Sequence, residues 1–275
     1  MSHIAFLGLG AMGRRMAARL VPDHTVAVWN RSAGVAVPGA ASAPTPAAAA
    51  SDADIVITMV TDDDAARSVW LGADGALTAM RPGAVAVEVS TVTPAWIAEL
   101  GAAADAREVR LLDAPVAGST PQAEAGALAF LVGGDEATFA EVRPVLALLS
   151  KVQIHAGARG RGAVLKLMVN ALFAAQVAAL GEVLQLAETQ GMTTEDAMRL
   201  LGPLPVTSPA AQGVGALMVA GDHGSRFPVR LVEKDLRYAV AAGAGPVIEA
   251  ARARYAAARE AGHGDANLTV VHTLA

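Results

Sequence analysis

The first residues that could do chemistry form a glycine-rich run that reads Gly8-Leu9-Gly10-Ala11-Met12-Gly13. This GxGxxG pattern follows an apolar run that predicts a strand, His3–Leu7, and it opens a predicted helix, Ala11–Leu20. In that setting the first glycine permits a tight turn, the second lets the backbone approach a pyrophosphate, and the third allows close packing of helix on strand. Free N–H groups at the helix start attract phosphates. We therefore expect this run to bind a dinucleotide through Gly8, Leu9, Gly10, Ala11, Met12 and Gly13.

The end of the next predicted strand, Thr25–Trp29, bears on which dinucleotide binds, because it runs into Asn30-Arg31-Ser32. Sites for NAD usually place Asp or Glu here, where the carboxylate binds the ribose hydroxyls. A carboxylate would repel a 2′-phosphate, whereas Arg31 can pair with one and Ser32 can donate a hydrogen bond to it. We predict that Asn30, Arg31 and Ser32 select NADP(H). The alternative is that Arg31 is a solvated surface residue.

A third strand end contributes to the same predicted cleft. The predicted strand Asp54–Val60 leads into Met59-Val60-Thr61. Ligands of open parallel sheets bind outside the carboxyl ends of the strands. We therefore expect Met59, Val60 and Thr61 to line the cofactor site.

A lysine and an asparagine four residues apart, Lys166 and Asn170, are candidates for the reaction itself. Residues at this spacing share one face of a helix. A lysine on a mostly apolar helix is costly to bury unless it is paired or functional, and desolvation favours its neutral form, which suits proton transfer. The residues alone leave a second interpretation open, in which the Lys166 ammonium reaches water at the helix start.

The elements that must position these residues alternate between strand and helix through the first half of the chain. Further predicted strands are Ala84–Ser90, Val109–Asp113, Ala127–Val132 and Val152–His155. Further predicted helices are Asp63–Leu71, Pro94–Ala104 and Glu136–Leu149, and a loop and a short helix are expected over 33–50. Such alternation predicts βαβ units in a doubly wound, mostly parallel sheet.

After His155 the pattern changes to helices alone. A helical run of about 25 residues follows Gly162, and further helical segments are expected around 208–221, 229–242 and 245–261. We therefore predict a Rossmann-type α/β domain over 1–160 and an all-helical domain over 161–275. The long helix carries few charges, so we expect it to be buried against several neighbours, and we predict a homodimer or homotetramer through the helical domain.

Composition excludes several classes of protein. The 275 residues include no cysteine, which rules out disulfide scaffolds, thiol nucleophiles and Cys-ligated metals. The net charge of −5, without a basic run, argues against nucleic acid as a partner. The most apolar stretch, Ala163–Ala187, contains polar side chains unsuited to a membrane span. The six histidines are scattered, so we assign no metal. We find no export signal and expect a cytoplasmic protein.

Five separated motifs together resemble the β-hydroxyacid dehydrogenase family, with a fold like that of 6-phosphogluconate dehydrogenase. They are Gly8–Gly13 with Asn30-Arg31-Ser32, then 89–94 (Val-Ser-Thr-Val-Thr-Pro), 113–119 (Asp-Ala-Pro-Val-Ala-Gly-Ser), 162–170, and Lys234-Asp235-Leu236. The resemblance implies an NADP(H)-dependent oxidoreductase that interconverts a small β-hydroxyacid and its semialdehyde or keto acid. Its nearest branch is the glyoxylate/succinic semialdehyde reductases.

The resemblance also implies roles for single residues. Lys166 would be the general acid and base, with Asn170 holding Lys166 or the substrate, and Thr91 would contact the nicotinamide side of the cofactor. Lys234 would reach the cofactor or the substrate. The family's usual serine is replaced by Ala117, so the backbone N–H groups of Gly118 and Ser119 would bind a carboxylate of the substrate.

Two alternatives use the same fold. An imine reductase is one, favoured slightly by Ala117 and opposed by Lys166, because members of that family generally have Asp or Tyr at the lysine position. A non-catalytic dinucleotide-binding or oligomerisation module is the other, and the presence of Lys166 argues against it.

Overall fold

The computed structural model describes residues 1–274 of the chain. These residues form two compact units, Met1–Lys166 and the part from Leu167 onward. The division falls inside one continuous helix, α7 (Arg161–Thr189), so the boundary placed at residue 160 stays a prediction.

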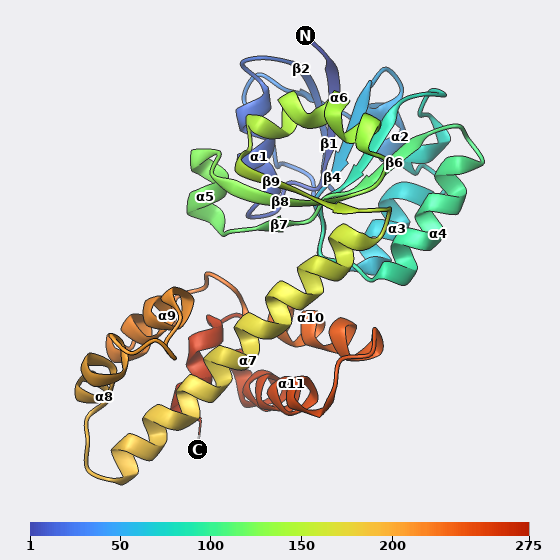
Figure 1. The fold of residues 1–275 in the computed structure, drawn as a ribbon. Helices are drawn as coiled ribbons and strands as arrows, with labels where there is room; N and C mark the ends of the chain where they lie inside the picture. Colours follow the sequence, from blue (N-terminus) through green and yellow to red (C-terminus); the bar gives the residue numbers. More distant parts are fainter. Residues whose placement is uncertain (275) are drawn as a thin grey trace. The chain divides into compact units, whose positions relative to one another are not determined.

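The first unit is built on a sheet that has nine strands within residues 1–274 (Figure 1). Its strands are β1 (His3–Leu7), β2 (Thr25–Trp29), β3 (Ala41–Ser42), β4 (Ile55–Thr58), β5 (Val85–Glu88), β6 (Arg110–Asp113), β7 (Val116–Ala117), β8 (Leu128–Gly133) and β9 (Ser150–Gly157). The order is β3-β2-β1-β4-β5-β6-β8-β7, with β9 beside β8. Pairing is parallel from β3 to β6, antiparallel where β8 meets β6 and β7, and parallel between β8 and β9. Because β2 and β4 flank β1, the strand order reverses at the carboxyl end of β1, where such sheets bind ligands.

Helices cover both faces of this sheet because its central strands are apolar at successive positions. In β1, Ile4 and Phe6 belong to one core cluster. Ala5 and Leu7 belong to another. The covering elements are α1 (Gly13–Leu20), α2 (Pro46–Ala50), α3 (Asp63–Leu71), the 3-10 turn η1 (Ala76–Thr78), α4 (Pro94–Asp105), α5 (Thr120–Ala125) and α6 (Glu136–Ala147). Side chains of α1, α5 and α6 complete the first cluster, and those of α2, α3 and α4 complete the second.

The second unit is helical. Described residues from Leu167 onward contain no β structure beyond an isolated bridge between Pro228 and Asn267. The unit contains most of α7, α8 (Thr194–Leu201), α9 (Pro209–Val219), α10 (Val229–Ala241), α11 (Pro246–Ala258), the π turn η2 (Arg259–His263) and the 3-10 turn η3 (Leu268–Thr273). Its core gathers along α7, where Leu167, Val177 and Leu184 belong to a cluster with side chains of α9, α10 and α11.

By length and composition α7 could cross a membrane, but a core helix meets the same criterion, and 44% of its most apolar window is buried within the protein.

The expected fold class, a doubly wound α/β domain followed by helices, is confirmed. Strands β1 and β2 have the predicted bounds, and the strands predicted at 127–132 and 152–155 are β8 and β9. Several predicted bounds differ from the structure by a few residues, as where β4 ends at Thr58 rather than Val60. Helix α1 begins at Gly13 rather than Ala11, because the preceding residues belong to the glycine-rich loop. The region 33–50 contains β3 as well as the expected short helix.

Candidate active site

The glycine-rich loop connects β1 to α1 at the carboxyl edge of the sheet. Gly8 has a φ of 97°, in the region that favours glycine, and a Cβ on it would lie 2.3 Å from the Met59 carbonyl oxygen. A Cβ on Gly13 would lie 2.0 Å from the Gly8 carbonyl oxygen. Gly10 differs because it is exposed, and a Cβ there would meet nothing within 4 Å. The loop is close-packed on its inner side and open at Gly10, so it fits a pyrophosphate approaching the start of α1.

Asn30 joins this loop to the end of β2. Its Oδ1 accepts a hydrogen bond from the Leu9 N–H at 2.9 Å, and its Nδ2 donates to the Ser32 carbonyl at 3.0 Å. Arg31 and Ser32 are exposed. Arg31 makes no hydrogen bond or ion pair with the other described residues. The Arg31 guanidinium is therefore available to a ligand, whereas Asn30 has a structural partner. Within the loop, Leu9 is buried, Met12 is half-buried and Ala11 is exposed.

The loops after β4 and β5 are joined to each other at the same edge. The Ser90 hydroxyl accepts a hydrogen bond from the Val60 N–H at 2.8 Å. Met59, Val60 and Thr91 are half-buried, and Thr61 is exposed. The structure thus places the residues predicted from the ends of β1, β2, β4 and β5 along one edge of one sheet.

Beneath these loops lies a carboxylate that the sequence analysis missed. Glu88, the last residue of β5, is fully buried and accepts hydrogen bonds from the Ser90 N–H at 2.9 Å and the Trp70 Nε1–H at 2.8 Å. Burial raises the pKa of Glu88, and hydrogen bonds from Ser90, Trp70 and Thr58 oppose that rise. The signal in the sequence was a glutamate inside an otherwise apolar strand.

The segment predicted to bind a carboxylate follows β7. Gly118 is exposed and has a φ of 124°, where a Cβ would lie 2.9 Å from Leu128 Cδ2. Ser119 is the N-cap of α5, and its N–H donates to Gln122 Oε1 at 3.0 Å. One of the two predicted backbone donors therefore already has a partner within the protein. Ala117 pairs with Ala129 in the ladder between β7 and β8.

Lys166 lies in the second turn of α7, and its side chain is buried. The start of that helix is bound to the sheet by Asp113, the last residue of β6. The Asp113 carboxylate is fully buried and accepts hydrogen bonds from the Gly160 N–H at 2.7 Å and the Ala163 N–H at 2.8 Å. A Cβ on Gly162 would lie 2.9 Å from the same carboxylate. Burial raises the pKa of Asp113, and the backbone hydrogen bonds lower it.

A second interaction, between Arg159 and Asp105, holds the residues just before α7. The Arg159 guanidinium makes two hydrogen bonds to the Asp105 carboxylate of α4, at 2.8 and 2.7 Å. It also crosses the surface of Gly101, where a Cβ would lie 2.7 Å from the guanidinium. The backbone that leads to Lys166 is therefore held by two carboxylates, Asp113 and Asp105.

In the second unit, Asn170 and Lys234 meet at a shared carboxylate. Asn170 Nδ2 donates to Asp235 Oδ2 at 2.6 Å, and Lys234 Nζ lies 2.9 Å from Asp235 Oδ1. All three side chains are buried, and the Lys234 ammonium lies 4.8 Å from the centre of the Tyr238 ring. Asp235 is a second residue of this constellation that the sequence analysis had not assigned, although it lies in a motif quoted for the resemblance.

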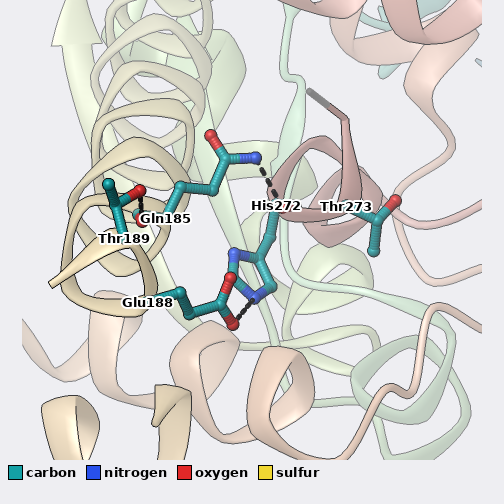
Figure 2. A pocket seen from close by; sticks show the side chains of 5 residues that line it. All are labelled: Gln185, Glu188, Thr189, His272 and Thr273. Atoms are coloured by element: carbon teal, nitrogen blue, oxygen red, sulfur yellow. Dashed lines mark hydrogen bonds and ion pairs between the residues drawn. The ribbon is translucent and has the colours of Figure 1, made fainter. Parts of the chain in front are cut away.

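A separate hollow of about 530 Å³ lies in the second unit between the end of α7 and η3 (Figure 2). Gln185, Glu188, Thr189, His272 and Thr273 line it, and none of them is a predicted site residue. Their polar groups have partners within the unit, as where Gln185 Nε2 donates to the His272 carbonyl at 2.7 Å. No group of three or more His, Asp or Glu side chains within residues 1–274 could hold a metal ion.

Comparisons with known proteins match both units. Residues 3–157 match the NAD binding domain of 6-phosphogluconate dehydrogenase, and residues 160–274 match the NAD-binding domain of NADP-dependent 3-hydroxyisobutyrate dehydrogenase. The chain is 32% identical to glyoxylate/succinic semialdehyde reductase 1 of Arabidopsis thaliana, covering 98% of this chain and 96% of that one.

Solved structures agree. The Mycobacterium tuberculosis 3-hydroxyisobutyrate dehydrogenase with L-serine superposes with a TM-score of 0.91 at 32% identity, covering 99% of this chain and 98% of that chain. An imine reductase from a Pseudomonas species superposes with a TM-score of 0.64 at 20% identity, covering 99% of this chain and 98% of that chain, and shows likeness of fold alone. Matching domains, relatives and motifs in one order lead to one conclusion: the chain belongs to the β-hydroxyacid dehydrogenase family, oxidoreductases that act on hydroxyl and carbonyl groups with a nicotinamide dinucleotide.

Proposed function

We propose that the protein is an NADP(H)-dependent oxidoreductase that interconverts a small β-hydroxyacid and its semialdehyde or keto acid. The observation that carries the proposal is the placement of Lys166. Its buried amine lies in the second turn of a helix whose start Asp113 binds to the sheet, one turn before Asn170. A buried amine can exchange a proton with a bound substrate.

The dinucleotide, when bound, supplies or accepts the hydride. Lys166 polarises the carbonyl oxygen of the substrate and donates the proton that completes the alcohol, and in the oxidative direction it takes up the hydroxyl proton. Asn170 donates hydrogen bonds that hold Lys166 or the substrate, and Asp235 fixes its amide orientation through Nδ2. The Lys234 ammonium, oriented by the same carboxylate, reaches the cofactor or the substrate.

The substrate class rests on the family and on Gly118 and Ser119. We propose that the exposed Gly118 backbone binds the substrate carboxylate. The Ser119 N–H is occupied by Gln122, and the Ser119 hydroxyl, which accepts the Gln122 N–H in the capping box of α5, would donate its own proton as a second contact. Ala117 provides no hydroxyl at the position of the family's usual serine. The similarity to a glyoxylate/succinic semialdehyde reductase supports a short aldehyde acid.

Preference for NADP(H) rests on Arg31. Its guanidinium is exposed and unpaired among the described residues, and the strand end lacks a carboxylate that would repel a 2′-phosphate. We expect Arg31→Ala to raise the KM for NADPH about tenfold or more and to leave the KM for NADH within about twofold, since one charge-assisted contact contributes about 1.5–3 kcal/mol. Arg199→Ala, which removes an exposed arginine of the helical unit, is the control. Equal use of NADH and NADPH by the wild type would contradict the preference.

The test of the reaction measures NADPH oxidation with glyoxylate, succinic semialdehyde, methylmalonate semialdehyde, tartronate semialdehyde and a cyclic imine. Lys166→Ala is expected to lower kcat at least about 100-fold on the best aldehyde acid, the range for losing a general acid. Lys151→Ala, which removes an exposed lysine of β9, is the matched control and should leave kcat unchanged. Turnover of the imine alone would favour the imine reductase alternative, and turnover that survives Lys166→Ala would remove Lys166 from the mechanism.

We further propose that the protein is a homodimer or homotetramer assembled through its helical unit. Helix α7 leaves Met168, Leu172 and Leu186 between 60% and 64% exposed, and apolar exposure of this kind marks association surfaces. Light scattering at micromolar concentration should give at least twice the chain mass, and Leu172→Glu should lower it. A monomer mass for the wild type would contradict the proposal. The expected cytoplasmic location stays a prediction.

A further inference from the structure

A buried network connects the two loops that follow β4 and β5. Thr58 and Glu88 end these strands and are paired in register. Both are fully buried, as are Ser90 and the Trp70 side chain of α3. Trp70 Nε1–H donates to Glu88 Oε2 at 2.8 Å and also reaches Thr58 Oγ1 at 3.2 Å. Polar groups gathered in an otherwise apolar layer are costly unless every member has a partner.

The network extends from Glu88 to both loops. Glu88 Oε1 accepts the Ser90 N–H at 2.9 Å, and the carboxylate also accepts a hydrogen bond from the Ser90 side chain. The Ser90 hydroxyl in turn accepts the Val60 N–H at 2.8 Å. Glu88 therefore fixes Ser90 by backbone and side chain at once, and through Ser90 it fixes Val60.

The loop that carries Thr91 is held at its other end as well. Thr93, the N-cap of α4, donates from its N–H at 2.9 Å and from its hydroxyl at 2.6 Å to the Asp63 carboxylate. Thr91 thus lies between two points fixed by carboxylates, Glu88 through Ser90 and Asp63 through Thr93. Preorganisation of this kind lowers the entropic cost of binding a ligand.

We propose that Glu88 is a positioning residue, which holds the Val60 and Thr91 loops in the geometry that binds the nicotinamide dinucleotide. The proposal rests on the proposed placement of the cofactor against Val60 and Thr91. It is independent of the role of Lys166 and of the choice between NAD and NADP.

The chemistry requires a carboxylate at this position. The partners described above, Trp70, Ser90 and Thr58, all act as donors to it. A glutamine has the same shape but only one acceptor oxygen, so its NH2 group would face the Ser90 N–H or the Trp70 N–H. In either orientation one hydrogen bond to the side chain at position 88 is lost and one buried N–H group, of Ser90 or of Trp70, is unsatisfied. Ser90, or the side chain that holds it, is then fixed less firmly.

The experiment titrates NADPH, and separately NADH, into cofactor-free protein and measures the Kd by calorimetry. Glu88→Gln should raise the Kd of the more tightly bound dinucleotide about tenfold, which corresponds to about 1.4 kcal/mol. The matched control is Glu99→Gln, an exposed glutamate of α4 paired with Arg67, and its Kd should equal that of the wild type. A Kd within twofold of the wild type for folded Glu88→Gln would overturn the proposal.

A double-mutant cycle with Ser90→Ala separates positioning from general destabilisation. If Glu88 acts through Ser90, Glu88→Gln should add less than twofold to the Kd of Ser90→Ala. Effects that multiply would mean that Glu88 does not act through Ser90, and would overturn the proposal. If Glu88→Gln does not fold, Trp70→Phe removes the N–H that reaches Glu88 Oε2 and Thr58 Oγ1 and should weaken binding about threefold, and an unchanged Kd would overturn the proposal.

Discussion

Replacing Asp113 by asparagine changes one oxygen of a buried carboxylate to an NH2 group at the start of the helix that carries Lys166. The carboxylate accepts two backbone N–H groups, from Gly160 and Ala163. An amide has one acceptor oxygen, so one of these donors keeps its bond and the other faces the new NH2 group. The first turn of α7 must then shift or leave an N–H unsatisfied.

The magnitude follows from opposing contributions. Losing a hydrogen bond to a charged group costs about 1.5–3 kcal/mol, and an unsatisfied buried donor costs about 1–3 kcal/mol. Removing the buried charge relieves the desolvation that raises the pKa of Asp113 and offsets part of this cost. We expect a net loss of about 2 kcal/mol in the free energy of unfolding. For a protein of this size that lowers the Tm by about 4–8 °C.

The effect on activity should exceed the effect on cofactor binding. Lys166 lies three residues beyond Ala163 on the same helix, and a displacement of about 1 Å at a reacting group can cost about 100-fold in rate. We expect kcat to fall between about 10-fold and 100-fold, with the Kd for the dinucleotide within about twofold. The assay combines thermal unfolding, calorimetric titration and steady-state turnover. Asp23→Asn, a change of the same type at an exposed position, is the control. An Asp113→Asn variant that matches this control in Tm and kcat would refute the reasoning.

The remaining predictions concern pH and the glycine-rich loop. Because burial raises the pKa of Glu88 and Asp113, their contribution to stability is full below about pH 4 and is lost as pH rises through the folded-state pKa. The free energy of unfolding in urea should therefore fall more from pH 4 to pH 8 in the wild type than in Glu88→Gln, and an equal fall in both proteins would contradict this. Gly10→Ala should leave the Tm within about 3 °C and weaken dinucleotide binding at least about tenfold, because its Cβ lies in open space where the pyrophosphate approaches. Gly13→Ala should lower both the Tm and the affinity for the dinucleotide, since its Cβ would collide with the Gly8 carbonyl oxygen. A folded variant of normal Tm would contradict this.

The central strands of the first unit were predictable because β1, β2 and β4 are short apolar runs between turn residues. A strand buried on both faces shows no alternation, and β1 and β4 have that pattern. The elements that were not predicted are short or irregular. Strand β3 has two residues, too few for a period, and the π turn η2 depends on Gly262 with a φ of 90°. Helix α8 has eight residues and one buried side chain, Ala197, so its apolar face is narrow.

The site residues were predictable where a local motif carries the chemistry, as with the glycine-rich loop. Asp113, Glu88 and Asp235 were not assigned because their function depends on partners distant in the chain. Asp113 meets the helix start about fifty residues later, and Asp235 meets Asn170, which lies 65 residues earlier.

An acidic residue within a predicted strand has two interpretations. It lies at a strand end exposed to solvent, or it is buried and accepts hydrogen bonds from backbone N–H groups elsewhere in the chain. Sequence separates them only when the donors are local. Glu88 has one local donor, Ser90, two residues away, but Trp70, another donor, lies 18 residues away and gave no signal, so Glu88 was not assigned. Because the first four N–H groups of a helix have no partner within that helix, a carboxylate placed beside a helix start at the carboxyl edge of a parallel sheet can fix a loop without contacting the ligand. Such residues are best sought by asking which backbone donors near a predicted site lack a local acceptor.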